Sequence, residues 1–313
     1  MKHVLVTGGA GFIGSSIACK LLETGYEVTA IDNMDDYYSF KQKEDNVRRI
    51  QEYEGCTFIR QDIREKGKTR KIIEEAGINT VIHEAAQAGV RASNNKPLKT
   101  LEDNCLGTLQ LLEETKDTSI EKIVYASSSS VYGRIEYLPF DEEHPKNPIS
   151  PYGASKVIAE SLIDLHTQNT GIEQAILRYF TVYGPRIRPD LAIRIFTEKA
   201  LKDEEIVIFG DGSKTRDFTY IDDAVDATIK ALEKGVGRYN IGGGSRISIK
   251  ELAEKIIKAT SSRSTIKYTE PVEGDVEHTL SDTRKARREL GWAPRTGIDE
   301  GLGKTIEWVK NKR

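Results

Sequence analysis

The chain has 313 residues, and 46 Lys and Arg against 49 Asp and Glu leave a net charge of −3. Because basic and acidic residues are nearly equal in number, the chain lacks the excess positive charge that attracts nucleic acid. No stretch approaches the ~20 apolar residues that span a bilayer, and the first apolar run meets a glycine turn instead of forming a signal peptide. The three cysteines are far apart and lack metal-ligand spacing. We therefore expect a cytoplasmic protein with no metal, no membrane contact and no nucleic-acid partner.

Short apolar runs alternate with segments of helical apolar spacing through the first half of the chain. The pattern predicts helices over 12–24 and 69–75 and from residue 152, and strands over 4–6, 27–31, 57–59, 80–83, 122–126 and 174–178. Such alternation indicates right-handed crossovers and a doubly wound parallel sheet of the α/β class. Beyond residue 184 the pattern is less regular, with a strand predicted over 206–209 and helices over 222–232 and 249–259.

Glycines at intervals of three follow the first strand and open the first helix. Glycine permits the tight turn, and the free N–H groups at the helix start face a pyrophosphate. Asp32 ends the second strand, where its carboxylate can accept hydrogen bonds from both ribose hydroxyls. A 2′-phosphate would meet that negative charge, so NAD is favoured over NADP. The expected cofactor contacts of this Rossmann unit are Gly8, Gly11, Phe12, Ile13, Gly14, Asp32, Asn33, Asp62 and Ile63.

Two of these assignments have plain structural alternatives. The glycines and Asp32 can serve only a turn and a surface cap, although finding both features together favours the cofactor site. Asp62, followed by Ile63, ends the third predicted strand and is expected to bond the adenine amino group. It can equally be a helix cap.

Tyr152 and Lys156 are four residues apart on a predicted helix, so their side chains lie on one face. A tyrosine titrates near pH ~10, and poising it near neutrality takes about three pH units, or roughly 4 kcal/mol. The Lys156 ammonium and the positive nicotinamide ring of NAD can supply this together, which would make Tyr152 a general base. Both cofactor and catalytic contacts are therefore expected of the pair. An exposed Tyr and Lys at helical spacing is the alternative.

With these residues in view, the sequence resembles the extended short-chain dehydrogenase/reductase family, and within it the nucleotide-sugar epimerases and dehydratases. The resemblance covers essentially the whole chain. It implies a catalytic hydroxyl at Ser128, three residues before the valine of Val131-Tyr132-Gly133, with sugar contacts from its neighbours. Its markers are residues 7–14, 83–87, 127–133, the Tyr152/Lys156 pair, 178–185 and 216–223.

The residues after Ser128 distinguish the reactions within this family. The related 4,6-dehydratases carry Asp-Glu at the two following positions, and the decarboxylases usually carry Glu at the second. Here the two positions are Ser129 and Ser130. Because neither carboxylate is present, the reaction that fits best is oxidation of the sugar at C4 followed by its reduction, with no net redox change.

Three segments resemble the UDP-glucuronate 4-epimerases: residues 32–38, 86–91 ending in Arg91, and Thr181 with 188–190. The galactose enzymes normally have Asn at the position of Thr181. Together, the Thr181 hydroxyl and the guanidinium fork of Arg188 can hold a C6 carboxylate. Arg188 binding phosphate or capping a loop is the alternative. At the UDP end, the resemblance implies a diphosphate clamp at Arg216, uracil packing on residues 207–210, and a uridine contact from Asp275. A basic residue that many members carry just after this aspartate is missing here.

These features predict an NAD-binding Rossmann domain over 1–180, to which segments near 217–245 return. Residues 181–216 and 246–313 are expected to form a smaller α/β lobe that binds the nucleotide sugar. The resemblance also implies a homodimer that pairs helices near 98–114 and 152–169, although the apolar stripe of the first can face its own core. The expected reaction is conversion of UDP-glucuronate to UDP-galacturonate. The alternatives are UDP-glucose/UDP-galactose 4-epimerisation and a catalytically silent NAD-binding scaffold.

Overall fold

The computed structural model describes residues 2–271, 274 and 276–312, and its centre is a seven-stranded sheet in which every neighbouring pair is parallel. The strand order is β10-β6-β5-β4-β1-β2-β3, so the winding reverses between β1 and β4, where a crevice opens at the carboxyl ends of the strands. This confirms the predicted doubly wound α/β fold. The strands are β1 (His3–Thr7), β2 (Glu27–Asp32), β3 (Cys56–Arg60), β4 (Thr80–His83), β5 (Lys122–Ser128), β6 (Glu173–Tyr179) and β10 (Gly237–Ile241).

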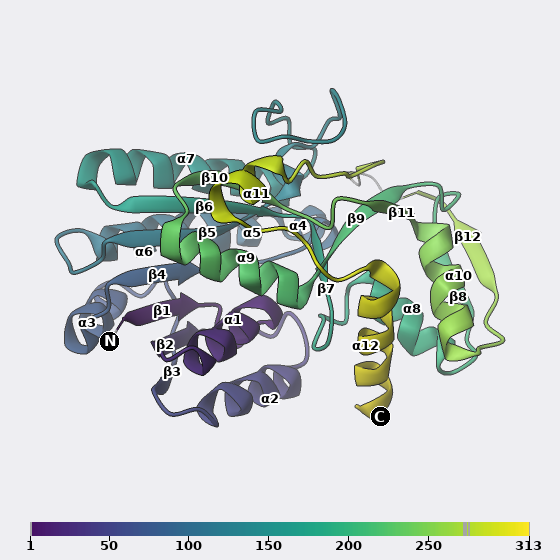
Figure 1. The fold of residues 1–313 in the computed structure, drawn as a ribbon, viewed down its shortest axis with the longest axis horizontal. Helices are drawn as coiled ribbons and strands as arrows, with labels where there is room; N and C mark the ends of the chain where they lie inside the picture. The colour runs from purple at the N-terminus through teal and green to yellow at the C-terminus, as the bar shows by residue number, and fades with distance from the viewer. Residues whose placement is uncertain (1, 272–273, 275, 313) are drawn as a thin grey trace.

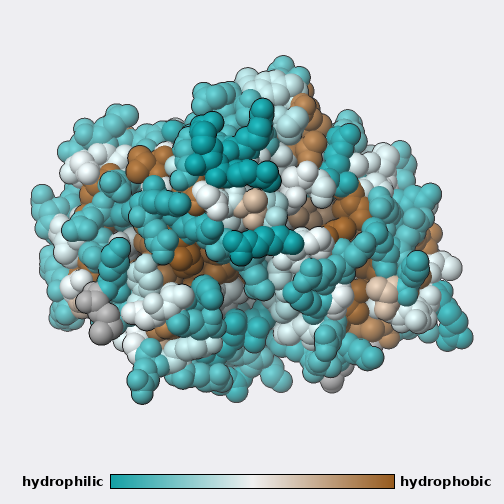
Figure 2. All heavy atoms as spheres, in the orientation of Figure 1, coloured by the Kyte–Doolittle hydropathy of each residue, from teal (hydrophilic) through white to brown (hydrophobic). Residues whose placement is uncertain are grey.

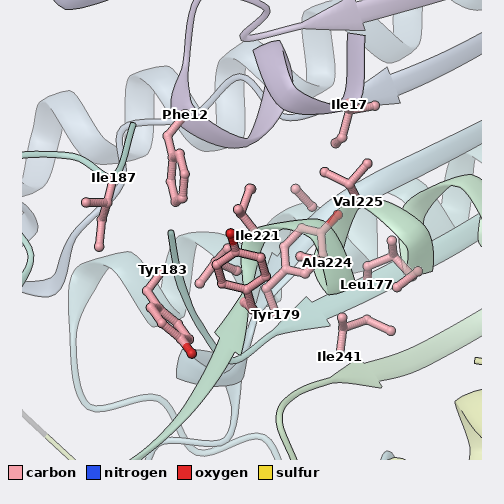
Figure 3. Close-up of a cluster of buried hydrophobic side chains, with 14 of the residues drawn as sticks. Phe12, Ile17, Leu177, Tyr179, Tyr183, Ile187, Ile221, Ala224, Val225 and Ile241 are labelled. Atoms are coloured by element: carbon pink, nitrogen blue, oxygen red, sulfur yellow. The ribbon is translucent and has the colours of Figure 1, made fainter. Parts of the chain in front are cut away.

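Helices cover both faces of this sheet (Figure 1). Apolar side chains of α3 (Lys68–Ala76), α6 (Gly107–Thr115) and α7 (Pro151–Thr170) pack on one face. On the other face, α1 (Phe12–Glu23) packs on β1, β2 and α9 (Ile221–Lys234), and α9 packs on β5 and β6. Figure 3 shows side chains of α1, α9, β6 and β10 in this part of the core. The segments α2 (Phe40–Gln51), α4 (Val90–Asn95) and α5 (Pro97–Leu101) complete this part.

A second group of elements lies beside the end of the sheet. The strands β7 (Thr181–Tyr183), β9 (Thr215–Tyr220) and β11 (Arg246–Ser248) form one small sheet, and β8 (Ile206–Phe209) pairs with β12 (Ile266–Thr269). The helices α8 (Ala192–Ala200), α10 (Ile249–Thr260) and α12 (Ile298–Asn311) gather around them (Figure 1). In contrast, α11 (Arg284–Leu290) packs against β10 and α9 of the large sheet. The expected division into two lobes therefore stays a prediction.

The helix expected over 98–114 is interrupted by a π-helical turn, Glu102–Leu106, between α5 and α6. Within this turn the Asn104 amide donates to the Gln87 carbonyl at 3.1 Å and to Ser155 Oγ at 2.8 Å, and its oxygen accepts from the Gln87 N–H at 2.7 Å. The side chain thus links two segments distant in sequence. Such turns recur at functional sites, because they re-aim a side chain without ending the helix.

The face shown in Figure 2 is mostly hydrophilic, with separate hydrophobic patches between the polar side chains. Across the described part of the chain, none of the helices combines the length and apolarity needed to cross a membrane.

Candidate active site

A cavity of about 880 Å³ opens at the carboxyl ends of the central strands and brings together nearly all predicted site residues. The exception is Asp275, which lies outside the described residues. Residues far apart in sequence therefore meet at one place, as one active site requires. The predicted residues that line the cavity are Gly8, Gly11, Phe12, Ile13, Gly14, Asp32, Asn33, Asp62, Ile63, Arg91, Ser128, Ser129, Ser130, Tyr152, Lys156, Thr181, Arg188 and Arg216.

The glycine turn has the close packing that a dinucleotide cradle requires. Gly8 adopts a φ of +69°, and a Cβ added to Gly14 would lie 2.3 Å from the Gly8 carbonyl oxygen. No side chain caps the N-terminus of α1, so the N–H groups of Phe12 and Ile13 stay available to an anion. The turn therefore fits a pyrophosphate as the sequence predicts.

Asp32 lies at the end of β2 with its carboxylate oriented by the backbone. The Ala10 N–H donates to it at 3.1 Å and the Met34 N–H at 2.8 Å. Lys43 Nζ lies 3.7 Å from Asp32 Oδ1, and both side chains are buried. Sequence reasoning missed Lys43, because no local pattern shows that α2 folds back over β2. The lysine partly neutralises the carboxylate on which the preference for NAD was based.

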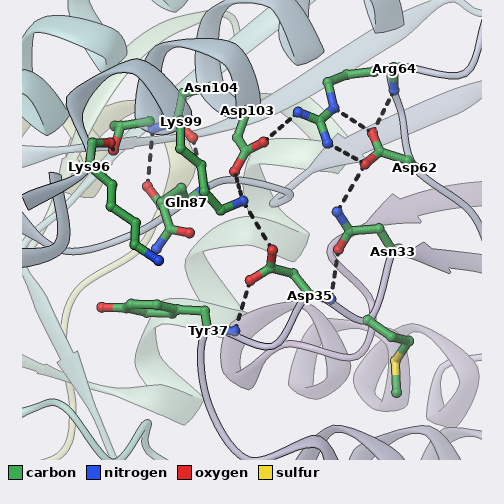
Figure 4. A network of polar contacts seen from close by, with 12 residues as sticks. Asn33, Asp35, Tyr37, Asp62, Arg64, Gln87, Lys96, Lys99, Asp103 and Asn104 are labelled. Carbon is green, nitrogen blue, oxygen red and sulfur yellow. Dashed lines mark hydrogen bonds and ion pairs between the residues drawn. The ribbon is translucent and has the colours of Figure 1, made fainter.

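A closed ring of polar contacts surrounds the neighbouring part of the cavity (Figure 4). Arg64 donates to both oxygens of Asp62, at 2.9 and 2.7 Å, and this hydrogen bonding lowers the pKa of Asp62 to about 2. Asp62 is therefore a fixed anion at the edge of the expected adenine site. The ring runs through Asn33, Asp62, Arg64, Asp103, Lys99 and Asp35 and back to Asn33.

The turn after β5 and the first turn of α7 pack closely together. Ser150 caps α7 by accepting from the Gly153 N–H at 3.1 Å. A Cβ on Gly153 would lie only 2.5 Å from the Ser130 carbonyl oxygen, so this position admits glycine alone without a shift. The contact holds Tyr152, the residue before this glycine, beside the serine turn.

Within the serine turn, Ser128 Oγ accepts from the Ser130 N–H at 3.1 Å and donates to Ser130 Oγ at 3.2 Å. The Ser128 hydroxyl also lies near enough to Tyr152 to oppose, in part, the burial that raises the Tyr152 pKa. The serine and the tyrosine that the sequence predicts to be catalytic thus lie at the same part of the cavity. Hydroxyls occupy the two positions after Ser128, where a dehydratase would carry acids.

Lys156 is buried beneath this pair. Its Nζ donates to the Ala126 carbonyl at 2.6 Å and lies 4.7 Å from the ring centroid of Tyr125 and 5.9 Å from that of Tyr152. Burial lowers the pKa of Lys156 to about 8, against the opposing effect of Glu84 and Glu160. The ammonium therefore stays charged at neutral pH by a small margin.

Lys156 and the positive nicotinamide ring of NAD are expected to lower the Tyr152 pKa together, and the chain without NAD does not lower it. Burial raises the pKa of Tyr152 above its ordinary value, and the groups that counteract this are Ser128 and Arg188. The physical reason is that the Lys156 ammonium is directed at the Ala126 carbonyl, while desolvation penalises the phenolate. A further positive charge is needed to poise the base.

Arg188 lies near Tyr152, but its guanidinium is engaged. Its Nε and Nη2 donate to the two oxygens of Asp190 at 3.0 and 3.1 Å, and the Tyr37 hydroxyl donates to Asp190 at 2.9 Å. Burial opposes the charge of Asp190, but the guanidinium outweighs it and holds the pKa of Asp190 below its usual value. Sequence reasoning placed Arg188 in the site and did not foresee its internal partner.

The other predicted contacts line the remaining part of the cavity. The Arg91 guanidinium stacks over the Phe209 ring with 4.4 Å between its carbon and the ring centroid. Arg216 Nη1 donates to the carbonyls of Thr215 and Glu277 at 2.8 and 3.1 Å. Thr181 begins β7 and is half-buried. Two cationic groups and an aromatic face therefore border the part of the cavity that is expected to hold UDP.

The described residues include no group of three or more His, Cys, Asp or Glu side chains arranged to hold a metal ion. The donors in the cavity are instead backbone N–H groups, hydroxyls and guanidinium groups, which suit phosphates and sugar hydroxyls.

The family model for GDP-mannose 4,6 dehydratase matches residues 5–305 of this chain. The chain belongs to this family of nucleotide-sugar enzymes. A putative UDP-glucose 4-epimerase of Methanocaldococcus jannaschii is 42% identical over 312 residues, which covers 98% of both chains. A UDP-glucuronate 4-epimerase of Thermodesulfobacterium geofontis is 39% identical over 313 residues, covering 99% of this chain and 97% of that one.

Among solved structures, a UDP-glucuronic acid 4-epimerase of Bacillus cereus in complex with UDP-glucuronic acid and NAD superposes with a TM-score of 0.95. It is 36% identical, and the match covers 99% of this chain and 100% of that one.

Proposed function

We propose that this chain is an NAD-dependent 4-epimerase that converts UDP-glucuronate to UDP-galacturonate through a transient 4-keto sugar. The observation that carries the proposal is the position of Arg188, a cation close enough to Tyr152 to oppose the burial that raises the Tyr152 pKa, at a site where serines replace the acids of a dehydratase. A cation beside the base that acts at C4 suits a sugar with a carboxylate at C6, which is two bonds away through C5.

The cofactor is held by residues whose placement fits a dinucleotide. The N–H groups that open α1 receive the pyrophosphate, and Asp32 receives the adenosine ribose. The ring around Asp62 borders the adenine. Bound NAD would supply reversible oxidation at C4 and a further positive charge near Tyr152.

Tyr152 carries out the proton transfer. Its phenolate oxygen takes the proton of the C4 hydroxyl as C4 becomes a ketone, and the phenol returns this proton when C4 is reduced on its opposite face. Ser128 supports the phenolate by hydrogen bonding, and Lys156 retains its charge below. Between the two steps the 4-keto sugar rotates so that the opposite face of its planar C4 is presented for reduction, while Arg216 keeps the diphosphate in place.

Thr181 and Arg188 hold the C6 carboxylate in this proposal. The sugar carboxylate replaces Asp190 on the guanidinium fork, and Thr181 adds a hydroxyl donor. Ser129 and Ser130 border the sugar ring, Arg91 with Phe209 borders the uracil, and Asp275 contacts the uridine.

Incubating the purified protein with UDP-glucuronate and, in parallel, with UDP-glucose tests the proposal. Chromatographic or NMR separation of the products should show UDP-galacturonate at a kcat/KM at least tenfold above that for UDP-glucose. Conversion of UDP-glucose alone would contradict the acidic substrate, and turnover of neither sugar would favour a silent NAD-binding scaffold.

UDP-glucose/UDP-galactose 4-epimerisation remains the second candidate, because a specific observation favours it. Asp190 already pairs with both donors of the Arg188 fork, so a sugar carboxylate would have to displace Asp190 to reach this guanidinium. A neutral hydroxymethyl group would enter without displacing Asp190.

We infer that the chain works as a cytoplasmic homodimer of two-lobed subunits. The predicted stripe is split: Cys105 and Leu112 face their own core, whereas Leu109 is exposed. Apolar side chains on the adjacent segments α5 to α7 favour a second copy of the chain as the partner, in a four-helix contact. The exposed residues are Leu98, Leu106, Leu109, Ile158 and Leu165. Light scattering should give twice the chain mass, and Leu106→Glu with Leu165→Glu should halve it; a monomeric wild type would contradict the inference.

A further inference from the structure

Glu84 is an acidic residue that the proposed mechanism does not use, although it lines the catalytic cavity. It follows β4 directly, and its backbone lies against the glycine turn, since a Cβ on Gly8 would be 2.9 Å from the Glu84 carbonyl carbon. The Tyr179 hydroxyl donates to Glu84 Oε1 at 3.2 Å and is itself paired with Thr228 Oγ1 at 2.6 Å. The carboxylate is therefore fixed in place beside the cofactor turn.

Strand register places Glu84 next to the catalytic lysine. β4 and β5 are parallel neighbours with His83 opposite Tyr125, so Glu84 comes level with Ala126 on a strand about 4.8 Å away. The Ala126 carbonyl is the acceptor of the Lys156 ammonium. A carboxylate and a buried ammonium thus meet at the same strand ends.

The charges of this group are coupled. Burial raises the pKa of Glu84 to about 7, and Lys156 is the main group that opposes this rise. In return, Glu84 is the largest influence that keeps the Lys156 ammonium protonated against burial, and it also raises the pKa of Tyr152. The other titratable or charged groups around these three side chains are Tyr37, Cys105, Tyr125, Glu160, Tyr179 and Arg188, with His83 buried next to Lys156.

We propose that Glu84 is a positioning residue that keeps Lys156 charged beneath Tyr152 and thereby sets the pH range in which proton transfer at the sugar C4 is fast. Glu84 does not contact the reacting atoms and acts through the lysine and the tyrosine. The inference rests on the proposed 4-epimerase chemistry and does not depend on whether the sugar is acidic or neutral.

The test is the pH profile of kcat for Glu84→Gln, measured with whichever UDP-sugar the wild type converts. Above about pH 7 Glu84 is ionised, so removing its charge lowers the pKa of Lys156 and moves the alkaline limb to lower pH, by on the order of one pH unit. Below about pH 7 Glu84 is largely protonated, so the acidic limb should move less and the optimum should shift to lower pH. Glu84→Asp, which keeps the charge, should retain the wild-type optimum. Glu75→Gln makes the same change in net charge at an exposed position on α3 and should leave the profile unchanged.

Each variant is first checked for bound NAD by absorbance and for folding by thermal melting. If Glu84→Gln does not fold, Glu84→Leu removes the charge with a side chain of similar size and should give the same displacement. An optimum that stays in place, or moves to higher pH, in an uncharged variant that folds and retains NAD would overturn the inference. Failure of the wild type to convert any UDP-sugar would instead contradict the proposed function.

Discussion

Arg188 and Asp190 form a two-pronged ion pair inside the cavity, with Nε and Nη2 of the arginine 3.0 and 3.1 Å from the two carboxylate oxygens. The same geometry is the one in which arginine recognises a free carboxylate ligand. Asp190 thus occupies the position that the proposed function gives to the sugar C6 carboxylate, and Tyr37 steadies it there.

Asp190→Asn should weaken this internal competitor. An amide offers no negative charge to the guanidinium, so we expect KM for UDP-glucuronate to fall about three- to tenfold, with little change for UDP-glucose. Steady-state kinetics on both sugars provide the measurement. A higher KM for the acidic sugar would show that Asp190 positions Arg188 for the substrate instead of competing with it.

Arg188→Ala should damage the reaction of the acidic sugar selectively. Losing a charge-assisted fork costs about 2–4 kcal/mol, which corresponds to a decrease in kcat/KM of roughly 30- to 1000-fold for UDP-glucuronate. Turnover of UDP-glucose, where present, should fall less, because that reaction loses only the effect of the guanidinium on the Tyr152 pKa. Equal losses on the two sugars would count against a carboxylate contact.

Tyr152 should titrate differently with and without NAD. In the NAD-free protein, burial holds its pKa above the ordinary value of 10.0, so the phenol stays protonated at pH 9. The positive nicotinamide favours the phenolate, so NAD binding should move the titration to lower pH. Tyrosinate absorbance near ~295 nm, with Tyr152→Phe as the reference, reports this difference. Coincident titrations with and without NAD would argue against a role of the cofactor charge in activating the base.

A stability prediction concerns the buried pair Arg178 and Glu160, which are 1% and 0% exposed. The arginine donates to both carboxylate oxygens at 3.0 and 2.9 Å, and Ser127 adds a hydrogen bond of 2.6 Å. Glu160→Gln leaves the guanidinium uncompensated and should lower the free energy of unfolding by about 3–5 kcal/mol. The matched control is Glu75→Gln, which breaks the exposed ion pair with Lys71. It should change the free energy of unfolding by less than about 0.5 kcal/mol in denaturant titrations. Equal effects would contradict the account of this pair.

The sheet and the cofactor turn could be predicted because their determinants are local. Residues 80–83 and 206–209 match β4 and β8 at both ends, and the glycine spacing identified the turn before α1. The strands β7, β9, β10, β11 and β12 escaped prediction, because these short segments mix polar with apolar residues and lack the continuous apolar run of residues 206–209.

The parts of the site that escaped prediction depend on contacts between distant segments. Lys43, on the next helix, lies against Asp32, and Asp190 accepts a hydrogen bond from Tyr37. Asn104 lies in a π-helical turn of a segment whose sequence predicts a regular helix. The orientation of the Lys156 ammonium is of the same kind, because the Ala126 carbonyl belongs to β5. Residue spacing shows that two side chains share a face but not which partner each one takes.

The most direct test of epimerisation through a 4-keto sugar is the fate of the hydrogen on the sugar C4. UDP-glucuronate labelled with deuterium at C4 is converted in ordinary water, and the product is examined by NMR. The deuterium should be retained at C4 of UDP-galacturonate, because that hydrogen leaves C4 and returns to its other face within one enclosed site. Loss of the deuterium to solvent, or incorporation of solvent hydrogen at C5, would contradict epimerisation through a 4-keto sugar.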